Sequence, residues 1–171
     1  NRWKFNISTL SRHIYGIGPA EFGIVFARPE VGKTAFVISI CAGPNGFCQQ
    51  GAKVLYLGNE EKTTRTKLSA IQACSGMNRE EIAANPDLAM SKYMSIKDRL
   101  VMKDIQEWDL DRVDSYCELN KPDVIILDQG DKINIAGNYN ASHERIRELF
   151  RSIRELSKRH NAALLTVSQA S

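Results

Sequence analysis

Five short apolar runs alternate along this chain with longer amphipathic stretches. The runs cover residues 22–27, 53–58, 93–96, 123–128 and 162–168, and the third is the weakest. They are continuously apolar rather than alternating, which is typical of strands covered on both faces. Strands separated by helices favour a parallel sheet with helices on both sides. The sequence therefore predicts an α/β fold with a mostly parallel sheet, in which ligands bind beyond the carboxyl ends of the strands.

Helical patterns occupy the stretches between these runs. Residues 33–42 are apolar nearly all round, which predicts a buried central helix. Further helices are predicted over 60–74, 103–119 and 142–160. Asn78, followed three residues later by Glu81, predicts a capped short helix that must end before Pro86.

Composition limits the class of protein. The chain has 171 residues, of which 43% are hydrophobic and 25% charged, with a net charge of +3. These values predict one globular domain over residues 1–171 and permit a nucleic-acid partner without requiring one. No apolar run is long enough to cross a membrane. The four cysteines show no C-x-x-C pair, so we expect reduced thiols in a cytosolic protein.

A phosphate-binding loop is predicted directly after the first run. The sequence Ala27-Arg28-Pro29-Glu30-Val31-Gly32-Lys33-Thr34 matches G-x-x-x-x-G-K-[ST], with alanine at the first glycine. In such a loop, backbone N–H groups and a helix N-terminus surround a phosphate, the lysine reaches the β- and γ-phosphates, and the threonine ligates Mg²⁺. The alternative is a surface turn that carries a lysine. The candidate nucleotide-binding residues are Ala27, Arg28, Pro29, Glu30, Val31, Gly32, Lys33, Thr34 and Ala35.

Polar residues also follow three of the other runs. Glu60 follows the second and is a candidate base for activating water, although a carboxylate there would also suit a helix start. Asp128 ends the run Val-Ile-Ile-Leu-Asp and is a candidate Mg²⁺ residue beside Thr34, unless it only starts a turn. Gln169 follows the last run and is a candidate sensor of the γ-phosphate.

With these motifs in place, the chain resembles the RecA-like ATPase core of DnaB-type replicative helicases, bacteriophage ring helicases included. The resemblance rests on residues 22–36 (FGIVFARPEVGKTAF), 54–61 (VLYLGNEE), 123–128 (DVIILD) and 163–169 (ALLTVSQ). It implies a P-loop NTPase that binds ATP and Mg²⁺ through Lys33, Thr34 and Asp128. It also implies that Glu60 is the catalytic base and that Gln169 couples hydrolysis to DNA movement.

The resemblance also implies partners. Family members assemble into a ring, expected to be a hexamer, translocate on single-stranded DNA, and in some cases meet a primase. They work in the cytoplasm of a bacterium or of a phage-infected host. Residues 129–140 correspond to a loop facing the central channel, where Lys132, Asn134, Asn138 and Asn140 would meet phosphates. A solvated turn is the equal alternative for this loop.

The family pattern is incomplete in this sequence. A second DNA-binding loop, further strands and an arginine finger follow the glutamine in the family, and we find no counterpart here. We therefore expect a C-terminally truncated fragment of a longer protein, feebly active by itself. A RecA-type recombinase, a P-loop small-molecule kinase and an inactive binding module are the alternative functions.

Overall fold

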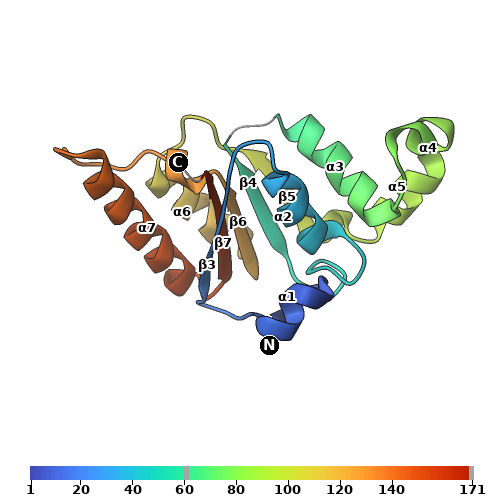
Figure 1. Ribbon diagram of the computed structural model, residues 1–171, viewed down its shortest axis with the longest axis horizontal. Helices are drawn as coiled ribbons and strands as arrows, with labels where there is room; N and C mark the ends of the chain where they lie inside the picture. Colours follow the sequence, from blue (N-terminus) through green and yellow to red (C-terminus); the bar gives the residue numbers. More distant parts are fainter. Residues whose placement is uncertain (60–61, 170–171) are drawn as a thin grey trace.

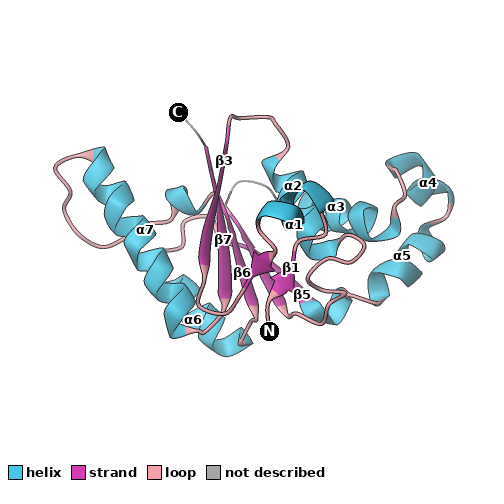
Figure 2. Cartoon of the chain, turned by 60° about the horizontal axis from the view of Figure 1, so that its bottom comes forward, coloured by secondary structure: helices cyan, strands magenta, loops and turns pink. Residues whose placement is uncertain are grey.

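A five-stranded parallel sheet forms the centre of the molecule. The computed structural model describes residues 1–59 and 62–169. The strand order is β3-β7-β6-β4-β5, and every neighbouring pair is parallel (Figures 1 and 2). The strands are β3 (Phe22–Ala27), β4 (Val54–Gly58), β5 (Leu100–Asp104), β6 (Val124–Asp128) and β7 (Ala163–Gln169). The predicted α/β class and parallel sheet are confirmed.

Helices cover both faces of this sheet, as predicted (Figure 1). The helices α2 (Lys33–Ala42) and α3 (Thr63–Ser75) lie on one side, and α6 (Leu110–Asn120) and α7 (Ser142–Arg159) on the other. Successive strand residues point to opposite faces, so each strand contributes to two cores. In β4, Tyr56 belongs to the core beneath α2, whereas Leu55 and Leu57 belong to the core beneath α7.

Smaller elements complete the described chain. They are β1 (Trp3–Lys4), α1 (Ser8–His13), β2 (Gly16–Ile17), α4 (Arg79–Ala84), α5 (Pro86–Met94), and the 3₁₀ turns η1 (Lys97–Arg99) and η2 (Gly130–Lys132). The strands β1 and β2 form a separate antiparallel pair. The capping box before α4 is confirmed, because the Asn78 side chain accepts from the Glu81 N–H at 2.9 Å while Glu81 accepts from the Asn78 N–H at 2.7 Å.

The strand predicted over 93–96 is wrong. Tyr93 and Met94 end helix α5, and the strand lies further on, in β5. Pro86 occupies the first turn of α5, and the Asn85 side chain caps that helix by accepting from the Leu88 N–H at 3.2 Å. The helix predicted from residue 103 starts only at Leu110, because residues 103 and 104 belong to β5 and the Asp109 side chain caps α6.

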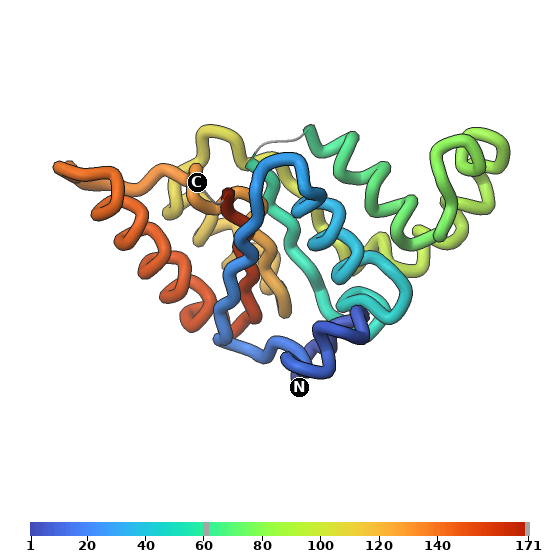
Figure 3. Tube along the Cα trace, viewed as in Figure 1, coloured from blue at the N-terminus to red at the C-terminus, as the bar shows by residue number. Residues whose placement is uncertain are grey.

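The carboxyl ends of the strands meet at one edge of the sheet. Ala27 lies opposite Gln169, and Gly58 lies between Asp104 and Asp128. Figure 3 shows the loop after β3 and the end of β7 at the same end of the molecule. All the candidate site residues that the structure describes therefore lie on or beside this edge.

Two further predictions concern membrane-spanning segments and the cysteines. Among the described helices, none is long and apolar enough to cross a bilayer. Each of the four cysteines is a free, buried thiol, as expected for residues that serve packing. Burial raises the pKa of Cys41 and Cys74, and it raises the pKa of Cys48 and Cys117 to about 12, so these thiols stay protonated at neutral pH.

Candidate functional site

The loop between β3 and α2 turns back on itself through two left-handed residues. Glu30 has φ 62° and Gly32 has φ 84°. Gly32 is also the residue that immediately precedes α2, and a methyl group placed on its Cα would meet no atom within 4 Å. Glycine is therefore needed at position 32 for its backbone conformation, and the space in front of it is open.

Unused backbone donors line this loop. The N–H of Phe36 donates to the Gly32 carbonyl at 2.9 Å and closes the first turn of α2. The N–H groups of residues 30–35 donate to no acceptor within residues 1–59 and 62–169. Donors of this kind at a helix N-terminus attract anions, and the helix dipole adds to the attraction. The loop has the geometry of a phosphate cradle.

Lys33 lies inside the curl of the loop rather than in solvent. The residue is only 9% exposed, and Nζ donates to the carbonyls of Ala27 at 3.1 Å and Arg28 at 3.0 Å. These two bonds hold the ammonium group among the free N–H groups. The lysine is thus placed where a bound phosphate would meet both a positive charge and backbone donors.

Thr34 and Asp128 meet although 94 residues separate them in the chain. The Thr34 hydroxyl donates to Asp128 Oδ2 at 2.7 Å, and the Tyr56 hydroxyl donates to the same oxygen at 2.5 Å. Asp128 is 6% exposed, and its backbone carbonyl accepts from the Asn59 N–H at 3.2 Å. Sequence reasoning predicted the pairing of Thr34 with Asp128 but missed Tyr56.

This donor set fits magnesium. Mg²⁺ prefers oxygen ligands and is usually held by one or two carboxylates, waters and substrate phosphates. Thr34 and Asp128 supply one hydroxyl and one carboxylate beside the phosphate cradle. The described residues contain no group of three or more histidine, cysteine or acidic side chains that would hold a metal without a nucleotide. Thr34 and Asp128 would hold a metal ion whose remaining ligands are phosphate oxygens and waters.

Polar groups without partners lie at the ends of β6 and β7. Gln129 follows Asp128 with φ 60°, is 2% exposed, and its Oε1 has no partner among the described residues. Ser168, on the neighbouring strand, has an equally unpaired buried hydroxyl within that part of the chain. Gln169 follows it, is exposed, and lies opposite Ala27. A buried amide oxygen and a buried hydroxyl without partners at such an edge are places where water binds.

The predicted base, Glu60, lies outside the described residues. Its neighbour Asn59 is described, and the hydrogen bond from Asn59 to Asp128 places the end of β4 beside the end of β6.

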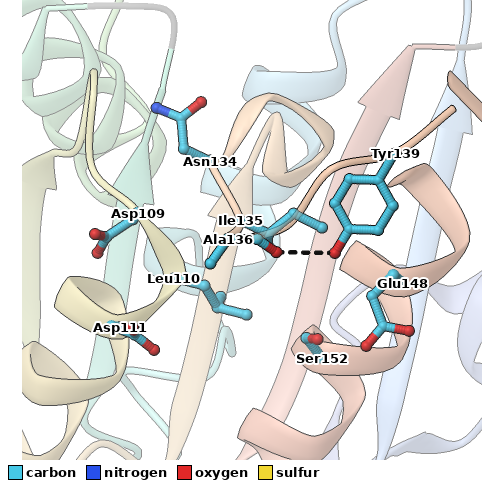
Figure 4. Close-up of a pocket in the computed structure, with 9 residues that line it drawn as sticks. All are labelled: Asp109, Leu110, Asp111, Asn134, Ile135, Ala136, Tyr139, Glu148 and Ser152. Carbon is cyan, nitrogen blue, oxygen red and sulfur yellow. Dashed lines mark hydrogen bonds between the residues drawn. The ribbon is translucent and has the colours of Figure 1, made fainter. Parts of the chain in front are cut away.

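The segment 129–140 leaves this edge and runs between α6 and α7. Arg145 of α7 fixes its start by donating to the carbonyls of Ile133 at 2.9 Å and Asp131 at 3.4 Å. A cavity of about 170 Å³ lies beneath it, lined by Asp109, Asp111, Asn134, Tyr139 and Glu148 among others (Figure 4). Three carboxylates make this cavity unsuitable for a phosphate.

The same segment carries the four polar residues that were predicted to meet DNA phosphates. Lys132, Asn134, Asn138 and Asn140 are exposed. Asn134 is held through its backbone, since its N–H donates to the Trp108 carbonyl at 3.4 Å and its carbonyl accepts from the Leu110 N–H at 3.0 Å. Contacts with DNA phosphates through this segment remain a prediction.

Comparison with known proteins places the chain in a family. A family model described as "AAA domain" matches residues 1–171. Among curated proteins, none matches the chain significantly.

Two solved structures share the fold. One is a DnaB-like replicative helicase described with its interactions with primase, at TM-score 0.82 and 18% identity, covering 99% of this chain and 43% of that one. The other is described as an ATPase domain, at TM-score 0.76 and 20% identity, covering 96% of this chain and 62% of that one. The chain therefore shares the fold of these two structures, and it spans about half of their length.

Proposed function

Because this chain belongs to the AAA domain family, we propose that it is the ATP-hydrolysing motor domain of a replicative DNA helicase. The observation that carries the proposal is the contact between Thr34 and Asp128 beside a loop of unused N–H groups. A phosphate cradle and a magnesium pair at one sheet edge favour a nucleoside triphosphate over a ligand without phosphates.

The candidate site residues have distinct roles in the proposed hydrolysis of ATP. Residues 27–35 surround the phosphates, Lys33 neutralises the β- and γ-phosphates, and Thr34 and Asp128 hold Mg²⁺ directly or through water. Bound magnesium would neutralise charge on the phosphates. Glu60 orients and deprotonates the attacking water. Gln169 lies at the exposed end of β7. It senses the γ-phosphate and couples its release to movement of the DNA.

The proposed partners rest on the resemblance to DnaB-type replicative helicases. We propose that the protein containing this chain assembles into a ring, with a hexamer expected, and moves on single-stranded DNA through residues 129–140. One related structure is described with its interactions with primase, which makes a primase a further candidate partner. A cytoplasmic location is part of the proposal, and the four free buried thiols support it.

Two variants test the nucleotide site. Lys33→Ala should abolish binding of a fluorescent ATP analogue, because it removes the ammonium group that the loop curl holds for the phosphates. Glu60→Gln should bind the analogue normally but hydrolyse ATP about 10²–10⁴-fold more slowly, the usual contribution of a positioned acid–base group. Arg12→Ala, on helix α1 away from this edge, is the control. Unchanged affinity in Lys33→Ala would refute the loop assignment, and turnover within a few-fold in Glu60→Gln would place the base elsewhere.

A further inference from the structure

Tyr56 is a buried polar residue that the roles above do not use. It is 2% exposed and lies in the middle of β4. Its neighbours in the core beneath α2 include Val54, Val124 and Ile126, which are all apolar. A hydroxyl buried in such surroundings is costly unless it has a partner. Tyr56 Oη donates to Asp128 Oδ2 at 2.5 Å, across 72 residues of sequence.

Sheet geometry makes this contact possible. Tyr56 lies opposite Ile126, and Asp128 lies opposite Gly58. Tyr56 and Asp128 are therefore diagonal neighbours on one face of adjacent parallel strands, a gap that a long aromatic side chain can span. Because Gly58 has no side chain, nothing on β4 stands between the phenol and the carboxylate. A glycine two residues after the tyrosine is thus part of the arrangement.

The two hydroxyls together fix the carboxylate. Tyr56 donates its proton to Oδ2 at 2.5 Å, and Thr34 donates its proton to the same oxygen at 2.7 Å. Hydrogen bonds to a carboxylate are stronger than those between neutral groups, so the pair holds Asp128 in one rotamer. A threonine whose oxygen ligates a metal can still donate its proton to Oδ2. A metal on the Thr34 oxygen is therefore compatible with both hydrogen bonds to Oδ2.

We infer that Tyr56 is a positioning residue for the magnesium site. It holds Oδ2 of Asp128 in place, so that Oδ1 of the same carboxylate is left to ligate the metal. The inference rests on the proposed function. Tyr56 reaches Asp128 from β4, whereas Thr34 reaches it from α2, so the carboxylate is held from two separate elements. Partners that orient a metal ligand in this way typically contribute about 10–100-fold to metal affinity or activity.

The test separates metal binding from nucleotide binding. Affinity for a fluorescent ATP analogue is measured in EDTA and across a Mg²⁺ titration, with no turnover required. In Tyr56→Phe, the Mg²⁺ concentration for half-maximal effect should rise about 10–100-fold, while the affinity in EDTA stays within about twofold of wild type because the loop is intact. Tyr93→Phe is the matched control, since Tyr93 is 3% exposed and lies on α5. It should leave the Mg²⁺ midpoint unchanged.

A double variant and a second substitution make the result decisive. In an Asp128→Asn background, Tyr56→Phe should cause no further rise in the Mg²⁺ midpoint, because the tyrosine acts through that carboxylate. Tyr56→Met fills the site without a donor and should repeat the Tyr56→Phe result. If folded Tyr56→Phe or folded Tyr56→Met has the Mg²⁺ midpoint of wild type, the inference about Tyr56 is wrong, while the proposed function still stands. Wild-type protein that binds no analogue, or binds it without regard to Mg²⁺, overturns the proposed function instead.

Discussion

At the scale of single residues, Gly130 shows how tightly the end of β6 is packed. A methyl group placed on its Cα would lie 2.2 Å from Thr166 Oγ1, far inside van der Waals contact. That oxygen donates to the Leu127 carbonyl at 3.2 Å and is therefore not free to move aside. The chain can turn directly behind Asp128 only because residue 130 lacks a side chain.

Gly130→Ala should therefore destabilise the fold by about 1–3 kcal/mol, the usual cost of overpacking a core. Urea unfolding of the variant measures this loss. Thr166→Ala removes the obstructing oxygen, so adding Gly130→Ala to it should cost clearly less than in wild type. Thr166→Ser keeps the oxygen and is the control that should give no relief. Equal penalties in all three backgrounds would contradict the packing argument.

Site residues that belong to a sequence motif can be predicted, whereas a site residue inside an apolar run cannot. Thr34 and Asp128 each lie at an end of an element in a recognisable motif, and the sequence predicts them near enough to share a magnesium ion; the structure places them 2.7 Å apart. Tyr56 lies inside a continuous apolar run, where its ring is typical of core packing. Its role depends on the register between β4 and β6 and on Gly58 opposite Asp128, which no local pattern reports.

At the scale of elements, local patterns predict most of the strands and one capped helix start, but they fail at the shortest apolar run and at the start of α6. Four strands and the capping box at Asn78 were predicted from local patterns alone. The run 93–96 was misassigned because Tyr93 and Ile96 are spaced for a helix face and are buried in the core beneath α2. A four-residue run fits both periods, and tertiary packing decides between them.

Two helices end in the left-handed conformation with different residues, which gives a paired prediction. Gly76 follows α3 with φ 70°, and Lys121 follows α6 with φ 47°. Gly76→Ala should cost about 1–2 kcal/mol through backbone conformation alone, since a methyl group there meets no atom within 4 Å. Lys121→Gly should stabilise by up to about 1 kcal/mol.

Chemical denaturation of both variants tests this pair. Lys121→Ala is the matched control: it removes the same exposed side chain but keeps the Cβ, so it should bring no gain. A stabilisation by alanine equal to that by glycine would show that the lysine side chain, rather than the backbone, is the unfavourable feature.

At the scale of the whole molecule, the two cores on either side of the sheet each hide thiols from water. Cys48 belongs to the core beneath α2 and Cys117 to the core beneath α6 and α7. Burial raises the pKa of both to about 12, from an ordinary value of 9.0. The repulsion of Asp114 adds to the shift at Cys117. The folded chain therefore keeps both protons at a pH where the unfolded chain releases them.

Stability should consequently fall as pH rises above about 9, because the unfolded state then binds fewer protons than the folded state. The slope from each thiol should appear near pH 9 and steepen toward pH 10, where the unfolded thiol is mostly deprotonated and the folded thiol still keeps its proton. Urea unfolding at pH 8, 9 and 10 measures the slope. Cys117→Ala should make the fall of the unfolding free energy with pH less steep, because one buried thiol is removed. This holds even if the substitution changes the unfolding free energy at pH 8. Ser115→Ala, an exposed position on the same helix, should leave the slope at its wild-type value. If the slope of Cys117→Ala matched that of wild type, the alkaline loss of stability would have to come from groups other than this buried thiol.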